Sequence, residues 1–80
     1  MNLSEQVTNK LRTVFAADDK IELIDEKHDG RHYLIKIISN RFDGKSRLER
    51  SRMIYALLGE YMKDDYIHAL RMELKTFAEV

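Results

Sequence analysis

Apolar residues recur every three or four positions in two parts of this chain, which is the period of a helix that buries one face. The first part covers residues 3–16, and the second lies within residues 41–61. In the second part, Ser46 and Glu49 have the spacing of a capping box, in which each side chain accepts a hydrogen bond from the other residue's backbone N–H group. The pattern therefore predicts two helices, the second beginning at Ser46. The core face of this second helix is predicted to carry Ile54, Leu57, Leu58 and Tyr61.

Three further segments have the apolar pattern of β-strands. Apolar and polar residues alternate over residues 20–25 and 67–74, which indicates strands with one buried face. Residues 33–39 are apolar on both faces, so we expect this strand to be better buried. An Asp-Gly pair between the first two strands is typical of a hairpin turn, which makes these strands antiparallel. Residues 76–80 are too short to assign, and we expect at most a frayed final turn there.

The order of these elements, helix-strand-strand-helix-strand, predicts an α+β domain. A helix between two strands of one sheet most often joins parallel neighbours by a right-handed crossover. The third strand is therefore expected to lie parallel to the second, with their first residues side by side. This placement brings His28, His32 and His68 to one end of the sheet. Because no repeat or linker interrupts the chain, we expect residues 1–80 to form a single domain with a modest core.

The composition excludes several kinds of site. The chain has no cysteine, so it cannot supply a disulfide, a thiolate metal ligand or a cysteine nucleophile. No serine lies in a GxSxG motif, and the Gly-Lys-Ser sequence at residues 44–46 lacks the earlier glycine of a P-loop. No apolar run is long enough to span a membrane, and the N-terminal residues resemble no targeting peptide. We therefore expect a cytoplasmic protein without enzymatic activity or membrane contact.

The three histidines have two interpretations that the residues alone leave open. Histidine is the commonest metal ligand among side chains, and a histidine cluster at the end of a sheet could hold zinc or iron. No HExxH motif or cysteine pair accompanies the cluster, however, so an independent structural metal site is not expected. The other interpretation is that the three are ordinary, partly exposed polar residues near a loop.

Basic residues gather around the start of the second helix, although the whole chain carries 14 basic and 14 acidic residues and no net charge. Free backbone N–H groups and the helix dipole favour phosphate at such a position, which would suit a nucleic acid. A solvated helix start is the simpler interpretation. The residues of this basic group are Arg41, Lys45, Arg47, Arg50 and Arg52.

Ser51 lies between two of these arginines, on the core-facing side of the second helix. Its hydroxyl is expected to form a hydrogen bond with a carbonyl of the preceding turn or with a neighbouring strand, which is a structural role. We predict that Arg50 and Arg52 point to either side, toward solvent or a partner. On this prediction, replacing both arginines by Glu leaves the fold intact.

Three blocks of the sequence resemble the BolA family and occur in the expected order: Ile-Ser-Asn-Arg-Phe-Asp-Gly-Lys-Ser at 38–46, Arg-Ser-Arg-Met-Ile-Tyr at 50–55 and Ile-His-Ala-Leu at 67–70. The resemblance covers residues 3–76. It implies a fold similar to type II KH domains, with a mixed three-stranded sheet and helices packed on one face in α-β-β-α-β order. That fold agrees with the element order that the apolar pattern predicts. The chain departs from the family in having Ser51 where many members have histidine, and in lacking the loop cysteine of some members.

The resemblance also implies a partner and a cofactor. BolA proteins pair with monothiol glutaredoxins and share a 2Fe–2S cluster, with the glutaredoxin cysteine and glutathione holding one side. His68 matches the C-terminal ligand position of the family, and His28 or His32 would supply the loop ligand. The resemblance thus predicts a non-enzymatic adaptor in iron–sulfur cluster trafficking or iron regulation, which carries no cofactor when free.

The alternative prediction is a KH-like transcriptional regulator that binds nucleic acid. The KH-like element order and the basic group favour it. Against it, the loop over residues 42–48 contains a single glycine, whereas the GxxG loop of KH domains has two. The zero net charge also indicates weak, salt-sensitive binding to nucleic acid.

Overall fold

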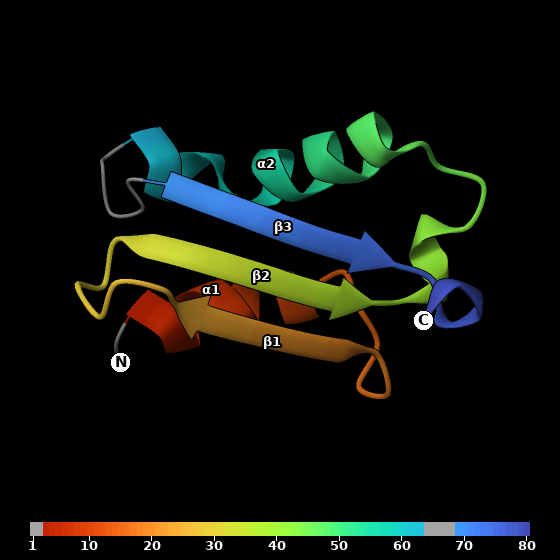
Figure 1. Ribbon diagram of the computed structural model, residues 1–80, viewed down its shortest axis with the longest axis horizontal. Helices are drawn as coiled ribbons and strands as arrows, with labels where there is room; N and C mark the ends of the chain where they lie inside the picture. The colour runs from red at the N-terminus through yellow and green to blue at the C-terminus, as the bar shows by residue number, and fades with distance from the viewer. Residues whose placement is uncertain (1–2, 64–68) are drawn as a thin grey trace.

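The computed structural model describes residues 3–63 and 69–80, and within them the elements follow the predicted order (Figure 1). Two short 3₁₀ helices, η1 and η2, accompany the helices and strands in these ranges. The elements are α1 (Leu3–Arg12), β1 (Lys20–Asp25), β2 (His32–Ile38), η1 (Asn40–Phe42), α2 (Arg47–Lys63), β3 (Ala69–Lys75) and η2 (Phe77–Glu79).

The described strands form one sheet in the order β1-β2-β3. β1 pairs with β2 in the antiparallel sense, and β2 pairs with β3 in the parallel sense. The parallel register places His32 beside Ala69 at one end and Ile38 beside Lys75 at the other. Both predicted pairings are therefore confirmed, and the first residues of β2 and β3 lie side by side.

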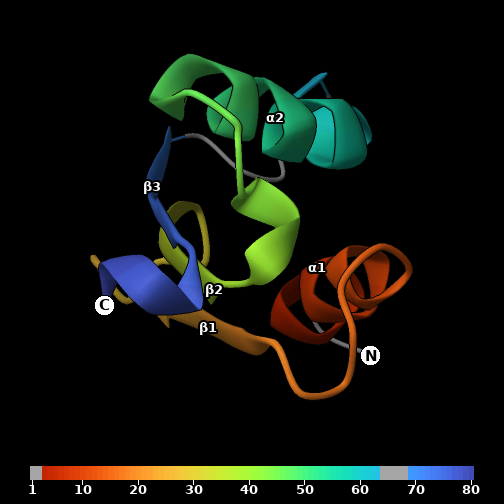
Figure 2. The same cartoon turned by 90° about the vertical axis from the view of Figure 1, so that its right-hand side faces the viewer.

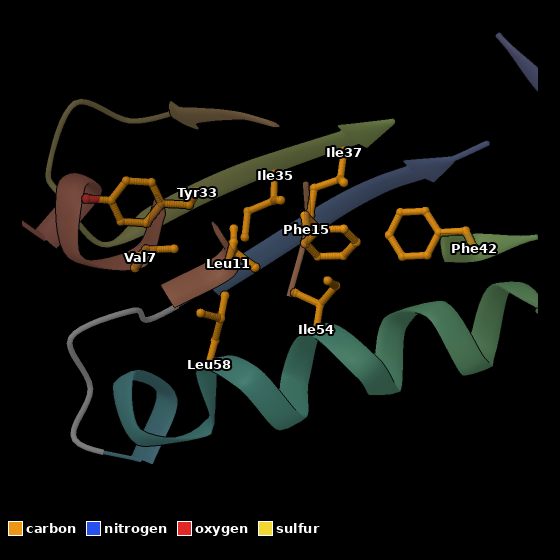
Figure 3. Close-up of a cluster of buried hydrophobic side chains, with 9 residues drawn as sticks. All are labelled: Val7, Leu11, Phe15, Tyr33, Ile35, Ile37, Phe42, Ile54 and Leu58. Carbon is orange, nitrogen blue, oxygen red and sulfur yellow. The ribbon is translucent and has the colours of Figure 1, made fainter. Parts of the chain in front are cut away.

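The helices α1 and α2 lie on the same face of the sheet (Figure 2). Their buried side chains meet those of the central strand in one core, drawn in Figure 3. Phe15 and Phe42 pack with their ring centroids 5.4 Å apart, so η1 and the turn after α1 also contribute to this core. The buried apolar residues are Val7, Leu11, Phe15, Tyr33, Ile35, Ile37, Phe42, Ile54 and Leu58.

Two local predictions about α2 are confirmed. The Ser46 N–H donates to the Glu49 carboxylate at 3.0 Å, and the Glu49 N–H donates to the Ser46 hydroxyl at 3.1 Å, which completes the capping box. The hydrogen bond from the Ser46 N–H is the largest cause that lowers the pKa of Glu49, and the Ser46 side chain adds to it. Ser51 donates from its hydroxyl to the Arg47 carbonyl, one turn earlier, at 3.1 Å.

The first helix is shorter than predicted, because α1 ends at Arg12 and not near residue 16. The Thr13 hydroxyl donates to the Lys10 carbonyl at 2.7 Å, and such side-chain hydrogen bonds compete with the helical backbone pattern. The apolar spacing extends past the helix because Phe15, in the turn that follows, still reaches the core. The apolar periodicity therefore identified the buried residues correctly but overestimated the length of the helix.

Ser39 joins three segments just beyond the end of β2. Its side chain is fully buried, donates to the Asp19 carboxylate at 2.8 Å and accepts from the Arg41 N–H at 3.1 Å. Its own N–H donates to the Lys75 carbonyl at 2.9 Å. These bonds hold the ends of β2 and β3 together, and they fix the start of the segment that leads to α2.

The buried face of α2 provides a test of the core. Leu58 is fully buried, whereas Leu48 on the same helix is 59% exposed. We expect Leu58→Ala to lower the free energy of unfolding by about 2–5 kcal/mol, because it removes packed methyl groups and leaves a cavity. Leu48→Ala is the matched control and should change it by less than about 0.5 kcal/mol. Urea unfolding followed by circular dichroism measures both changes. Equal losses of stability in the two variants would contradict the assignment of Leu58 to the core.

Candidate functional site

The hairpin between β1 and β2 is organised by the carboxylate of Asp25. It accepts hydrogen bonds from the Gly30 N–H at 2.7 Å and from the Asp29 N–H at 3.2 Å. Gly30 has a φ of 71° and His28 has a φ of 55°, so the turn passes twice through the left-handed region. Glycine tolerates that conformation, and histidine adopts it more often than most other residues do, although it is uncommon outside glycine. His28 is exposed in this turn.

His32 begins β2, and Asp29 in the hairpin holds its ring. The distance from Nδ1 of His32 to Oδ2 of Asp29 is 2.6 Å. The other oxygen of Asp29 accepts from the N–H groups of Arg31 at 2.9 Å and His32 at 3.2 Å. The backbone bond from Arg31 is the largest cause that lowers the pKa of Asp29, and the His32 contacts add to it. The ring of His32 is thus oriented by a carboxylate that is itself firmly held.

The third histidine of the predicted cluster, His68, lies outside the described residues. Its neighbour in the chain, Ala69, is the register partner of His32 across the parallel pairing. The structure therefore brings the start of β3 to the histidine end of the sheet. Within residues 3–63 and 69–80, no three His, Cys, Asp or Glu side chains are grouped so that they could hold a metal ion.

Four of the five basic residues predicted to form a surface group are exposed, namely Arg41, Lys45, Arg47 and Arg52. The fifth, Arg50, is only 8% exposed, so the prediction that it points toward solvent or a partner is wrong. It lies four residues before Ile54 on the core-facing stripe of α2, and this spacing was the signal for its burial.

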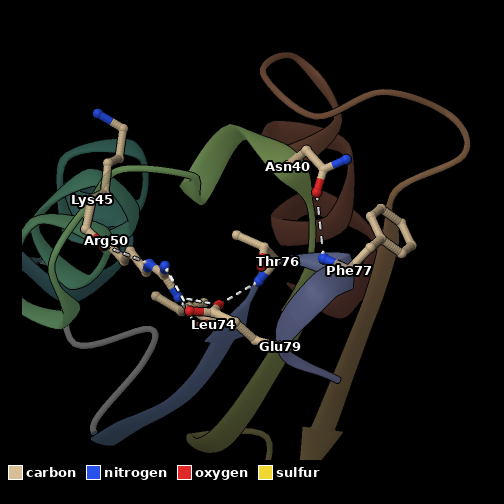
Figure 4. Close-up of polar contacts among 7 residues, drawn as sticks. All are labelled: Asn40, Lys45, Arg50, Leu74, Thr76, Phe77 and Glu79. Carbon is tan, nitrogen blue, oxygen red and sulfur yellow. Dashed lines mark hydrogen bonds and ion pairs between the residues drawn. The ribbon is translucent and has the colours of Figure 1, made fainter.

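The guanidinium of Arg50 joins α2 to the end of the chain (Figure 4). It forms a bidentate ion pair with Glu79, with N–O distances of 2.7 and 3.1 Å. It also donates to the carbonyls of Lys45 and Leu74, both at 3.0 Å. Its central carbon lies 5.7 Å from the centroid of the Phe42 ring, within the range of a cation–π contact.

Glu79, which the sequence analysis did not single out, is the anionic partner in this arrangement. Besides the ion pair, its carboxylate accepts from the Thr76 N–H at 2.7 Å and completes a capping box at η2. The hydrogen bonds from Arg50, followed by that from Thr76, lower the pKa of Glu79 to about 2. Phe77–Glu79 therefore form the docked 3₁₀ turn η2, and the expectation of a frayed end at residues 76–80 is wrong.

The comparisons with known proteins agree with this fold. The family model described as BolA-like protein matches residues 6–79. The chain belongs to the BolA-like family. It is 30% identical over 71 residues to the acid stress protein IbaG of Escherichia coli, which covers 89% of this chain and 84% of that protein.

Other BolA-like proteins are similar over nearly the whole chain. The DNA-binding transcriptional regulator BolA of Escherichia coli is 31% identical over 86 residues, which covers 99% of this chain and 80% of that protein. The solved structure of BolA1 from Arabidopsis thaliana superposes with a TM-score of 0.83 at 31% identity, and covers 100% of this chain and 98% of that one. As for membranes, no helix within the described ranges is long and apolar enough to cross one.

The opposite environments of neighbouring arginines predict opposite mutational effects. We expect Arg50→Glu to lower the melting temperature by several degrees or more, because it places a carboxylate against Glu79 and removes the donors to two carbonyls. Arg52→Glu, two positions further along α2 and exposed, is the matched control and should melt close to the wild type. Thermal denaturation followed by circular dichroism checks both, and equal melting temperatures would contradict the assignment.

The ion pair also predicts a dependence on pH. The pKa of Glu79 is lowered from 4.5 to about 2, so its contribution to stability is present above pH 4.5 and is lost as the pH falls through about 2. We expect Glu79→Gln to be less stable than the wild type at neutral pH, with a difference that shrinks over this acidic window. Urea unfolding of both proteins across the pH range measures it. Glu60→Gln, on the exposed side of α2, is the control; a difference for Glu79→Gln that stays constant down to pH 2 would contradict the prediction.

Proposed function

We propose that this BolA-like protein is a non-enzymatic adaptor that shares a 2Fe–2S cluster with a monothiol glutaredoxin. The observation that carries the proposal is the parallel pairing of β2 and β3, in which His32 is the register partner of the residue that follows His68. The ring of His32 is oriented by Asp29. Membership of the BolA-like family supports it. The cluster is cargo in this proposal, passed on or sensed by the pair of proteins.

The chemistry of the side chains explains why a partner is needed. Iron–sulfur clusters are held mainly by cysteine thiolates, and this chain contains no cysteine. Histidine can replace thiolate on one of the two irons, and the replacement raises the reduction potential of the cluster. The glutaredoxin cysteine and glutathione would hold one side, and histidines of this chain the other. Because glutathione is a reductant of the cell interior, the proposal places the protein in the cytoplasm.

Two histidines of the hairpin compete for the role of second ligand beside His68. Metal-binding histidines almost always donate one ring N–H to a carboxylate or carbonyl, which fixes the orientation of the ring. The contact of 2.6 Å between Nδ1 of His32 and the Asp29 carboxylate is an interaction of this kind. His28 lies in an exposed turn, and no described contact orients its ring in this way. We therefore propose His68 and His32 as the ligands, with His28 as the rival of His32.

A second candidate function is nucleic-acid binding, which the exposed cations around the start of α2 favour. The similar Escherichia coli BolA is named a DNA-binding transcriptional regulator. The burial of Arg50 removes one cation from the group, and the loop before α2 offers one glycine, Gly44, where a GxxG loop has two. Titration of DNA and RNA at two salt concentrations tests this candidate, because phosphate contacts weaken as salt rises.

The adaptor proposal is tested by mixing the protein with a cluster-loaded monothiol glutaredoxin and recording visible circular dichroism. We expect a new spectrum and a heterodimer on size exclusion. His68→Ala and His32→Ala should each abolish the new spectrum, because each removes a proposed ligand.

His28→Ala is the matched control in the same hairpin and should retain the spectrum, as should Lys63→Ala at the end of α2. An unchanged spectrum together with no heterodimer would refute the adaptor function. A spectrum that depends on His28 instead of His32 would keep the function and overturn the ligand assignment.

A further inference from the structure

A groove of about 510 Å³ lies between α2 and β3, toward the end of β3 that is remote from His32. One wall is formed by the first turns of α2, including Arg47, and the other by residues 72–75 of β3. The volume is within the range of sites that hold a small ligand or a short peptide segment. The adaptor function proposed above does not use this groove, although Arg47 in its wall also belongs to the basic group considered for nucleic-acid binding.

The β3 wall of the groove is the free edge of the sheet, since in the described part of the chain β3 pairs only with β2. The Lys75 carbonyl accepts from the Ser39 N–H, so the backbone of Lys75 points inward, toward β2. The Leu74 carbonyl accepts from Arg50 and therefore points outward. Backbone groups of successive strand residues point to opposite sides, so the N–H and C=O of Met72 also face outward. Such an edge is a template for another strand.

The charges around the groove are not balanced. Glu79 is paired with Arg50, and Glu73 lies 3.6 Å from the Lys36 ammonium, so both acids of the lining are compensated. Arg47 and Lys75 are exposed and form no ion pair with any residue in the described ranges. Two uncompensated positive charges therefore flank the free edge of β3.

We propose that this groove binds an extended acidic peptide segment of a partner protein. The segment adds as a strand along the outer edge of β3, pairing with the backbone of Met72, and its carboxylates meet Arg47 and Lys75. Strand addition obtains affinity from main-chain hydrogen bonds and selectivity from side chains on alternate sides. Arg47 lies on α2, on the helix side of the sheet. Lys75 follows Leu74, which packs against the core, and therefore lies on the open side. Because adjacent residues of an added strand also point to opposite sides, one acidic residue would be directed toward each cation. The surface is separate from the histidine end and goes beyond the adaptor function.

The probe is a fluorescein-labelled peptide of the sequence Thr-Glu-Glu-Thr-Thr-Glu-Glu-Thr, titrated by fluorescence anisotropy. We expect saturable binding to the wild type, weakened about tenfold or more in Arg47→Glu and in Lys75→Glu, because each puts like charges face to face. Arg52→Glu is the matched control, since it reverses an exposed arginine of α2 outside the groove, and should bind within about twofold of the wild type. Circular dichroism first verifies that all variants are folded.

Two further probes separate strand addition from general attraction between opposite charges. The same peptide with alternate backbone amides methylated keeps its carboxylates but cannot pair with an edge, so its binding should be lost. In nuclear magnetic resonance spectra, the unmethylated peptide should shift the amides of Met72 and Leu74. A single-stranded oligonucleotide of equal charge should bind more weakly than the peptide, because its phosphodiester backbone has no amide N–H or C=O groups to pair with a strand edge.

Each contrary result overturns the proposal: no saturable binding, equal binding of the methylated peptide, equal or tighter binding of the oligonucleotide, or no loss in the charge-reversal variants. His68→Ala should bind the peptide as the wild type does. This variant therefore separates failure of the groove from failure of the cluster-sharing function.

Discussion

The burial of one arginine side chain holds three segments together at one end of this fold. A guanidinium removed from water must be paired and hydrogen-bonded, because an uncompensated buried charge is strongly destabilising. Arg50 meets this requirement with Glu79, two backbone carbonyls and the face of Phe42. These partners come from the loop before α2, the end of β3 and the terminal turn. In the sequence, Arg50 resembled part of a surface binding site. In the structure, its side chain links three segments of the fold.

The parallel pairing of β2 and β3 gives the sheet two different ends. At one end, the first residues of both strands meet, and the hairpin adds an oriented histidine. At the other end, Ser39 and Arg50 fasten the strand ends, and the groove opens between α2 and β3. Because β3 is an edge strand along its whole length, one strand contributes to both surfaces. On the two proposals above, one end of this domain would bind the cluster and the edge of β3 would bind a partner segment.

The distribution of cations bears on the choice between an adaptor and a nucleic-acid regulator. In the sequence, five basic residues around one helix start suggest a phosphate site. In the structure, Arg50 is neutralised internally, while Arg47 faces a strand edge. Phosphate recognition at a helix start gains from clustered cations and free N–H groups, and here the capping box with Glu49 already uses one of those groups. The burial of Arg50 and the use of this N–H group by the capping box both weaken the case for a phosphate site at this helix start.

Much of this fold follows from local patterns in the sequence. The apolar spacing and the Asp-Gly hairpin identified the elements, and the Ser46–Glu49 spacing identified the start of α2. The crossover rule identified the parallel pairing. Such features depend on neighbours a few residues apart or on handedness, and both are visible without coordinates.

Tertiary structure alone decided which polar residues are free to act. Arg50 and Glu79 are 29 positions apart, and nothing local pairs them until β3 brings the terminal turn against α2. Asp29 and His32 are close in sequence, yet their contact requires the left-handed turn at His28 and Gly30. The groove exists only because α2 lies beside an unpaired strand edge. Sequence periodicity records which side of an element is buried, whereas the pairing of charges depends on distances that only the folded chain defines.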